Sequence, residues 1–240
     1  MLHRTEGIVL KTIPFAEADL IVTTLTLDYG LIRVFAKSPR KTGSRFGSSL
    51  EPFTYSRISF WGKENKDLPR LTQSDIIKNF QCLREELECF LGLLKIIDLT
   101  LRVAPEREAL PDLFYLLLNT LIEIERYRTN RNGTSQKTYL DTITIFYNIH
   151  LLDLAGFGPR FNGCARCNRE GFNFYISHGS VLCEDCASTS EHIRLTQQVI
   201  KVYETLRRWD ISKLERIRLT EPIIRQLSNI INAHINSVIQ

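Results

Sequence analysis

The first third of the chain alternates apolar and polar residues over short runs that are separated by turn-forming residues. In the run LIRVFA, Ile32, Val34 and Ala36 fall on one face and Arg33 and Phe35 on the other. A period of two residues is typical of β-strands. Comparable runs, rich in Ile, Val, Thr and aromatic residues, occupy residues 7–13, 18–27, 53–61 and 68–77. Five short strands in about 75 residues predict a small closed sheet, and the OB-fold, a five-stranded barrel, is its natural candidate.

After Ile77 the apolar residues recur at helical spacing instead. The pattern predicts helices over residues 82–103, 112–127, 138–155, 196–209 and 220–239. Pro111 suits the first turn of the second helix, Gly156 the C-terminal end of the third, and Thr220 the N-cap of the last. Helices of this apolar density pack together as a bundle. The predicted fold class is therefore α+β, with several domains.

Composition and charge add a weak preference for an anionic partner. The chain has 240 residues, 43% of them hydrophobic, and a net charge of +4. Both ends are basic and the middle is acidic, which is compatible with a polyanion such as nucleic acid. The first residues do not form a secretory signal, and no apolar run is long enough to cross a membrane. We therefore expect a cytoplasmic protein whose thiols are reduced.

Four cysteines near the end of the chain have the spacing of a metal site. Cys164, Cys167, Cys183 and Cys186 form a C-x2-C-x15-C-x2-C pattern, which is typical of a tetrahedral four-thiolate zinc site. Residues 172–182 between the pairs predict a hairpin that turns at His178 and Gly179. We expect one structural zinc ion, because four thiolates leave no open position for a reacting water. Replacement of one ligand by His178 remains an alternative.

The two remaining cysteines belong to a different environment. Cys82 and Cys89 lie seven residues apart on a predicted helix, which separates them by about 10 Å, too far for a disulfide. We expect them to be small core residues. The predicted domains are an OB-fold over residues 1–79, a helical domain over 80–157 and 191–240, and a zinc-binding insert over 158–190.

A cationic loop, KSPRKTGSRFG (37–47), follows the third predicted strand. No acid lies between Tyr29 and Leu50. The strand after the loop is predicted to place Phe53, Tyr55, Arg57 and Trp61 on one face, with Phe60 buried on the other. Cations interleaved with aromatic rings suit single-stranded nucleic acid, because cations neutralise phosphates and rings stack on bases. The candidate phosphate-binding residues are Arg33, Lys37, Arg40, Lys41, Arg45 and Arg57; the alternative is a solvated surface loop.

Two stretches resemble a known family. Residues 31–60, including Ala36-Lys37, Arg40, Leu50 and Pro52-Phe53-Thr54, look like the A-K-x-x-R and L-x-P-F-T stretch of the RecO family of bacterial recombination mediators. Residues 150–167, HLLDLAGFGPRFNGCARC, are similar to the helix of that family that precedes its C-x-x-C motif. Ser38 stands where the family usually has Gly. The resemblance spans nearly the whole chain.

The resemblance to the RecO family implies functions that the composition and spacing of the residues do not indicate. It implies binding of single- and double-stranded DNA, annealing of complementary strands, and work with RecR to load RecA onto DNA coated by single-stranded-DNA-binding protein. The acidic, apolar-ended tail of that protein is expected to dock near Arg207 and Arg208, unless these residues only cover the bundle. The resemblance also implies that the protein is associated with the nucleoid in the bacterial cytoplasm.

No catalytic constellation is found in the sequence, which has no P-loop, no G-x-S-x-G and no H-E-x-x-H motif. We therefore do not expect an enzyme. An RNA-binding protein with an OB-fold and a zinc ribbon is the main alternative, and a scaffold that binds only proteins is the second.

Overall fold

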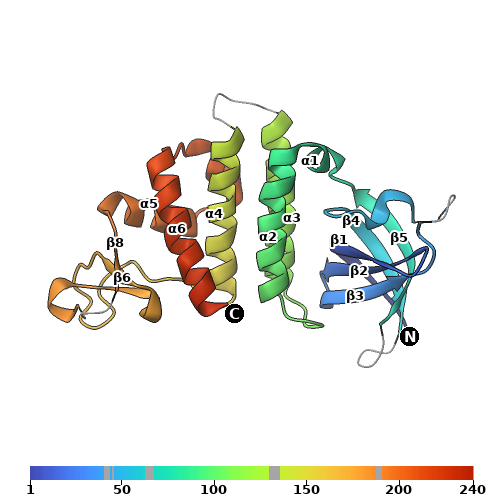
Figure 1. The fold of residues 1–240 in the computed structure, drawn as a ribbon, viewed down its shortest axis with the longest axis horizontal. Helices are drawn as coiled ribbons and strands as arrows, with labels where there is room; N and C mark the ends of the chain where they lie inside the picture. Colours follow the sequence, from blue (N-terminus) through green and yellow to red (C-terminus); the bar gives the residue numbers. More distant parts are fainter. Residues whose placement is uncertain (41–43, 45, 63–67, 130–135, 188–190, 240) are drawn as a thin grey trace. The chain divides into compact units, whose positions relative to one another are not determined.

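The computed structural model describes residues 1–40, 44, 46–62, 68–129, 136–187 and 191–239. The chain forms two compact units, Met1–Glu125 and Arg126–Gln240. Each unit combines strands and helices (Figure 1), so the predicted mixed α+β class is confirmed. The boundary between the units falls within the helix α3 (Pro111–Thr129).

The first unit begins with five strands that close into a barrel. They are β1 (Leu2–Phe15), β2 (Asp19–Thr26), β3 (Gly30–Ala36), β4 (Tyr55–Trp61) and β5 (Arg70–Lys78). Their spatial order is β1-β2-β3-β5-β4, and β1 pairs with β4 as well as with β2. All five predicted strands are present, and their arrangement is consistent with an OB-fold. The first strand begins at Leu2, five residues before the predicted start.

The barrel core follows from the period-two pattern. Ile32, Val34 and Ala36 are buried on β3, whereas Arg33 is exposed, as the alternation predicts. The 3-10 turn η1 (Gly47–Leu50) follows the cationic loop, and the apolar side chains at its ends enter the same core. The buried barrel cluster consists of Val9, Val22, Ile32, Val34, Ala36, Phe46, Leu50, Ile58, Phe60 and Leu71.

Phe53 is not an exposed ring that could stack on bases. It is fully buried, whereas Trp61 and Arg57 on β4 are exposed as predicted. The alternation does not reach Phe53, because β4 begins only at Tyr55. The backbone of Phe53 has a positive φ of 70°, and its N–H donates to the carbonyl of Val9 at 2.7 Å. Its ring is covered by Phe90, with ring centroids 5.8 Å apart, and Phe60 is buried as expected.

Three helices complete the first unit: α1 (Gln81–Glu85), α2 (Leu87–Val103) and α3. The single helix predicted over residues 82–103 is interrupted at Glu86, whose backbone is extended. Apolar spacing could not reveal this break, because Leu83 and Leu87 keep a spacing of four residues across it. Pro111 is the first residue of α3, as expected. Neither Cys82 nor Cys89 is in a disulfide; Cys89 is buried, as expected of a core residue, and Cys82 is half-buried.

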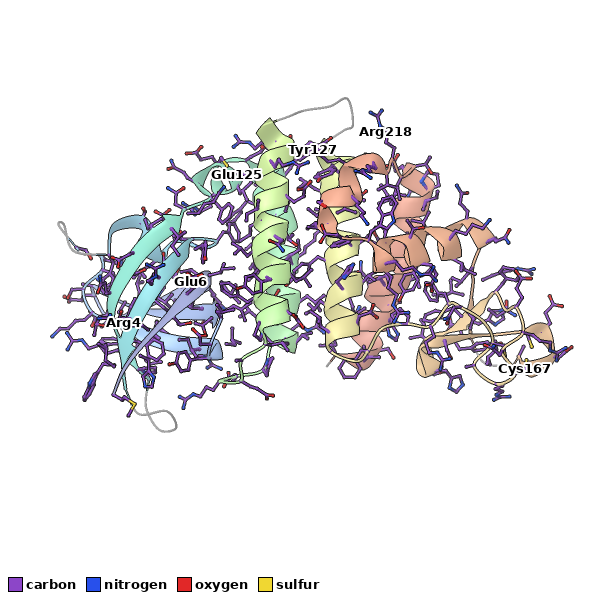
Figure 2. The ribbon with its side chains drawn as sticks, turned by 180° about the vertical axis from the view of Figure 1, so that it is seen from behind. Arg4, Glu6, Glu125, Tyr127, Cys167 and Arg218 are labelled. Carbon is purple, nitrogen blue, oxygen red and sulfur yellow. The ribbon has the colours of Figure 1, made fainter. Side chains whose placement is uncertain are left out.

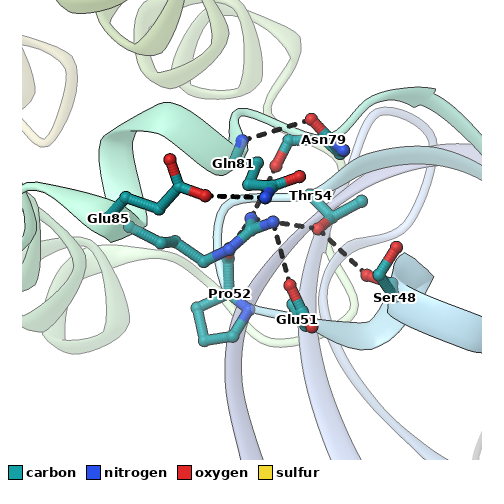
Figure 3. A network of polar contacts seen from close by, with 8 residues as sticks. Ser48, Glu51, Pro52, Thr54, Asn79, Gln81 and Glu85 are labelled. Atoms are coloured by element: carbon teal, nitrogen blue, oxygen red, sulfur yellow. Dashed lines mark hydrogen bonds and ion pairs between the residues drawn. The ribbon is translucent and has the colours of Figure 1, made fainter.

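The side chain of Arg84 fastens α1 to the turn before β4. Figure 3 shows the residues around it, among them Glu51, Pro52 and Asn79. Its Nη1 donates to the carbonyls of Pro52 at 2.9 Å and of Asn79 at 2.5 Å. Its Nη2 lies 2.9 Å from the carboxylate of Glu51. A guanidinium presents several donors in a fixed fork, so one side chain can satisfy all these acceptors. These contacts fix the orientation of the short helix α1 on the barrel. The helix α2 is a separate helix that begins after Glu86.

The second unit contains α4 (Gln136–Leu154), α5 (Gln197–Arg208), the 3-10 segment η4 (Ile211–Arg216) and α6 (Glu221–Val238). The hydroxyl of Thr196 accepts from the N–H of Val199 at 3.2 Å and caps α5. Thr220 occupies the N-cap position of α6, as predicted, and its side chain makes no cap hydrogen bond. Gly156 has a φ of 79° just after α4, the left-handed conformation expected after a helix end. No helix in the described part of the chain could span a bilayer.

A small sheet follows α4 in this unit. Its strands are β6 (Asn173–Tyr175), β7 (Ser180–Leu182) and β8 (Ile193–Arg194), in the order β7-β6-β8. The predicted hairpin is confirmed: β6 and β7 are joined by η2 (Ile176–His178) and by Gly179, which has a positive φ of 58°. Phe174 on β6 contacts Phe161, and Phe161 contacts Tyr203 of α5. The hairpin is thus packed on the helices of its own unit.

Candidate nucleic-acid interface and metal centre

The predicted phosphate-binding residues occupy two regions of the barrel. Arg33 lies on β3, and Lys37 and Arg40 follow directly after it; Arg57 lies on β4. Lys41 and Arg45 lie outside the described residues. Because β5 separates β3 from β4 in the barrel, Arg57 is not an immediate neighbour of the other three. The structure therefore places Arg33, Lys37 and Arg40 along β3 and the chain directly after it, and leaves Arg57 apart.

Two of these arginines already have acidic neighbours. Arg33 forms an ion pair with Glu106, and Arg57 lies 3.6 Å from Glu6 of β1, which is labelled in Figure 2. Glu6 also accepts a hydrogen bond from the hydroxyl of Tyr55. Partial burial, followed by this hydrogen bond, raises the pKa of Tyr55 to about 12. Exposed pairs contribute little stability, so a phosphate can compete with either carboxylate.

Lys37 and Arg40 present their charges differently. Both are exposed, and neither pairs with an acid of the described residues. The backbone between them is held by the β1–β2 turn, because the N–H of Ser38 donates to Asp19 at 2.6 Å and that of Arg40 to Ala18 at 3.3 Å. Ser38 has a φ of 55°, a conformation that glycine adopts without strain. This backbone explains why glycine is suited to that position.

The four predicted cysteine ligands lie together at one end of the small sheet. Their Sγ atoms are all within 4.8 Å of one another, and those of Cys167 and Cys183 are 3.5 Å apart. Zn–S bonds of about 2.3 Å in a tetrahedron place the sulfurs about 3.8 Å apart. The cluster therefore has the donor atoms and the dimensions of a four-thiolate metal site. His178 is not part of it.

Tight turns position each pair of sulfurs. The N–H of Cys164 donates to the carbonyl of Arg169 at 2.7 Å, and the carbonyl of Cys164 accepts from Asn168 at 2.8 Å. Gly163 and Asn168 both have positive φ angles, of 110° and 60°. In the second pair, the N–H of Cys186 donates to the carbonyl of Cys183 at 3.1 Å. Figure 2 shows Cys167 at the end of the small sheet.

The electrostatics of the cluster favour a cation. Burial raises the pKa of the Cys164 thiol, but hydrogen bonds from the backbone N–H groups of Cys183, Arg166 and Cys167 outweigh it and lower that pKa to about 6. Side-chain hydrogen bonds with Cys167 and Cys183 raise the pKa of Cys186 to about 12. Four thiols this close resist losing every proton, because each thiolate repels the next. A bound metal cation removes that repulsion and displaces the protons.

The two candidate partner-binding residues end α5. Nε of Arg207 donates to the carboxylate of Asp153 on α4 at 2.7 Å, so this side chain ties two helices together. Arg208 is 77% exposed and lies 3.5 Å from the carboxylate of Glu204 on the same helix. Arg208 is therefore the more accessible of the two. No local pattern indicates the contact of Arg207 with Asp153, which lies 54 residues away.

Comparison with known proteins identifies the family. Residues 1–80 match the model of the recombination protein O N-terminal domain, and residues 84–240 match that of its C-terminal domain. The chain belongs to the RecO family. It is 40% identical to the DNA repair protein RecO of Thermodesulfovibrio yellowstonii, over all of this chain and 94% of that protein. It is 31% identical to DNA repair protein RecO of Dehalococcoides mccartyi, over 99% of this chain and 90% of that protein. The predicted resemblance to RecO is confirmed, and a general role in DNA repair is supported.

Sequence reasoning missed the acids that face the predicted cations of this RecO-family chain. Glu106 lies 73 residues from Arg33, in the segment between α2 and α3. The segment is held against the start of β3, where the N–H of Leu31 donates to the carbonyl of Pro105 at 3.1 Å. No local pattern reports such a long-range contact. Glu106 and Glu6 reduce the positive charge at Arg33 and Arg57, so the strongest unpaired charge falls on Lys37 and Arg40.

Proposed function

We propose that this RecO-family chain binds single- and double-stranded DNA through its N-terminal barrel, which we assign as an OB-fold. It anneals complementary strands and, with RecR, helps to load RecA onto DNA coated by single-stranded-DNA-binding protein. The observation that carries the DNA-binding step is the exposed pair Lys37 and Arg40, which forms no ion pair with an acid of the described residues and is held on the barrel by the β1–β2 turn. Arg33, Lys41, Arg45 and Arg57 complete the proposed phosphate contacts. We place this activity in the bacterial cytoplasm, at the nucleoid, without a catalytic step.

We further propose that the four-cysteine cluster holds one structural Zn²⁺. The spacing of the sulfurs supports this metal, because zinc accepts four thiolates in a tetrahedron. Cys164, Cys167, Cys183 and Cys186 would be the ligands. Bound zinc would tie the two turns of the module together and leave no position for a reacting water. The proposed domains are 1–79, 80–157, 158–190 and 191–240, with the zinc module inserted into the helical part.

A strand-annealing assay tests the proposed function directly. We expect the chain to accelerate annealing of complementary oligonucleotides, both bare and coated with single-stranded-DNA-binding protein. Arg208→Ala should slow annealing only on the coated strands, because the proposed role of Arg208 is to bind the acidic tail of that protein. No acceleration and no DNA binding at low salt would overturn the function and favour a protein scaffold. Tighter binding to RNA of matched sequence would favour the RNA-binding alternative.

The phosphate contacts predict a measurable salt dependence. Each neutralised phosphate releases condensed counterions, so the logarithm of the affinity falls with that of the salt concentration by about 0.7 per contact on single strands. We expect the double substitution Lys37→Ala and Arg40→Ala to make this slope shallower by about 1.4, for every DNA sequence alike. The measurement is the affinity for one oligonucleotide at four or more salt concentrations.

A charge-matched variant separates a local contact from a general loss of charge. Lys213 and Arg218 are exposed cations of the second unit, and replacing both by Ala removes the same two charges. This control should leave the slope close to that of the unsubstituted chain. An equal slope in the Lys37 and Arg40 variant and the unsubstituted chain would move the DNA path away from this part of the barrel.

A further inference from the structure

One end of the barrel carries a row of exposed side chains on three neighbouring strands. Phe35 of β3 is paired with Arg70 of β5, and Arg70 is paired with Trp61 of β4. Residues directly opposite each other on paired strands point to the same face. The next residues along β4 and β5, Phe60 and Leu71, are buried, so the row Phe35–Arg70–Trp61 faces outward. We call these three residues the aromatic row.

The rings of the aromatic row are not covered by the rest of the first unit. Trp61 is 60% exposed. Phe15, at the end of β1, is 50% exposed and meets Phe35 edge to face, with ring centroids 5.9 Å apart. Single exposed apolar residues are ordinary on protein surfaces. Three exposed or half-exposed aromatic rings around one arginine form a contiguous surface that needs a further explanation.

Cations border the aromatic row on β3 and β5, and two acids, Glu17 and Asp19, lie at the β1–β2 turn, where Asp19 pairs with Phe15. Within the described residues, Arg70 has no acidic partner, and Lys37 continues the outward face of β3 two residues after Phe35. The acidic segment between α2 and α3 meets the opposite end of β3, at Leu31 and Arg33. The aromatic row therefore lies at the cationic end of the strand. Such a surface is complementary to a ligand that combines flat rings with negative charge.

We propose that Trp61 and Phe35 stack on unpaired bases of single-stranded DNA, with Arg70 on a phosphate between them. This inference rests on the proposed function and names the part of the barrel that distinguishes single strands from duplexes. Stacking needs an exposed base face, which a duplex does not offer. OB-folds bind oligonucleotides on the face of strands 2 and 3 and at the loops between strands 1 and 2 and strands 4 and 5. Phe35 lies on β3, Phe15 precedes the first of these loops, and Trp61 and Arg70 flank the second.

Fluorescence offers a direct test, because the chain has two tryptophans. In a Trp209→Phe background, Trp61 is the single tryptophan, and we expect oligothymidine to quench its emission until the site is saturated. Trp61→Ala and Phe35→Leu should each weaken binding of oligothymidine by about 5- to 150-fold, the range found for loss of one stacked base. Binding of a blunt duplex should change much less. Phe35→Leu keeps an apolar side chain, so the barrel core is preserved.

The salt dependence separates the rings from the arginine. Trp61→Ala should lower affinity without changing the salt slope, whereas Arg70→Gln should make the slope shallower by about 0.7. Tyr115→Ala is the matched control, because Tyr115 is a 48% exposed ring on α3, away from the aromatic row. It should bind oligothymidine like the unsubstituted chain.

The outcomes distinguish this inference from the proposed function. If the unsubstituted chain binds both DNA forms, and Trp61→Ala and Phe35→Leu bind oligothymidine equally well, the aromatic row is not a stacking surface and the proposed function stands. Equal weakening for single strands and duplexes would also overturn the stacking role. Failure of the unsubstituted chain to bind any DNA at low salt would overturn both.

Discussion

Replacing Cys183 by Ser is expected to abolish metal binding and to unfold the cysteine module. Cys183 is buried and lies in a small cluster with Cys164, Tyr175 and Leu182. The two cysteine turns therefore have few apolar contacts apart from the metal, although Phe161 and Phe174 pack the hairpin against α5. In small zinc domains the metal contributes about 10–16 kcal/mol of apparent binding free energy, which is folding free energy. We expect elemental analysis to find one zinc per unsubstituted chain and none in the variant. Removal of zinc by a chelator should have the same effect.

The matched control for this experiment is Cys82→Ser, which removes a thiol outside the cluster. This variant should keep its zinc. Hydrogen exchange should locate the damage in Cys183→Ser within residues 159–187 and leave the barrel strands protected, because the barrel has its own core. Metal-free protein from an unsubstituted, chelator-free preparation would contradict the proposed zinc site. Equal exchange in both variants would contradict its structural role.

The features that the sequence predicted best are those that depend on short-range periodicity or on fixed spacing. The alternation in LIRVFA predicted which residues of β3 are buried, because side chains of a strand point to opposite faces in turn. The C-x2-C-x15-C-x2-C spacing predicted four sulfurs in one place, because each C-x2-C turn presents two of them together. The strand prediction needs only the local geometry of the backbone. The cysteine prediction needs the local geometry of each C-x2-C turn and the pairing of the two turns.

The errors arose where the tertiary structure changes a local pattern. Phe53 continues the alternation of β4 in sequence, yet the strand starts two residues later, and the ring of Phe53 is buried against Phe90 of α2. The break at Glu86 lies within an unbroken apolar pattern. The ion pair between Arg33 and Glu106 joins residues that are remote in the chain. In each case the deciding contact comes from a segment that the local sequence does not contain.

Replacing Arg84 by Ala is expected to destabilise the first unit by about 1–3 kcal/mol, the usual effect of leaving a poorly hydrated acceptor without its hydrogen bond. The carboxylate of Glu51 is 52% exposed, so water can hydrate it after the substitution. The side chain of Arg84 is only 13% exposed, and it serves the carboxylate of Glu51 and the carbonyls of Pro52 and Asn79 (Figure 3). Without the guanidinium, the two carbonyls lose charge-assisted hydrogen bonds in a place that water reaches poorly. The measurement is the free energy of unfolding from denaturant titration, followed by a signal of the barrel such as the emission of Trp61.

Two further variants show whether the loss of stability in Arg84→Ala comes from the lost hydrogen-bond geometry or from the lost charge. Arg84→Lys keeps the positive charge near Glu51, but a single ammonium lacks the planar fork that reaches both carbonyls, so it should recover only part of the lost stability. Arg57→Ala removes an exposed arginine whose carboxylate partner is 3.6 Å away, and it should lower stability by less than about 1 kcal/mol. If Arg84→Ala is no more destabilising than Arg57→Ala, α1 does not depend on this network for its attachment to the barrel. Full recovery in Arg84→Lys would assign the effect to charge and not to the fork of hydrogen bonds.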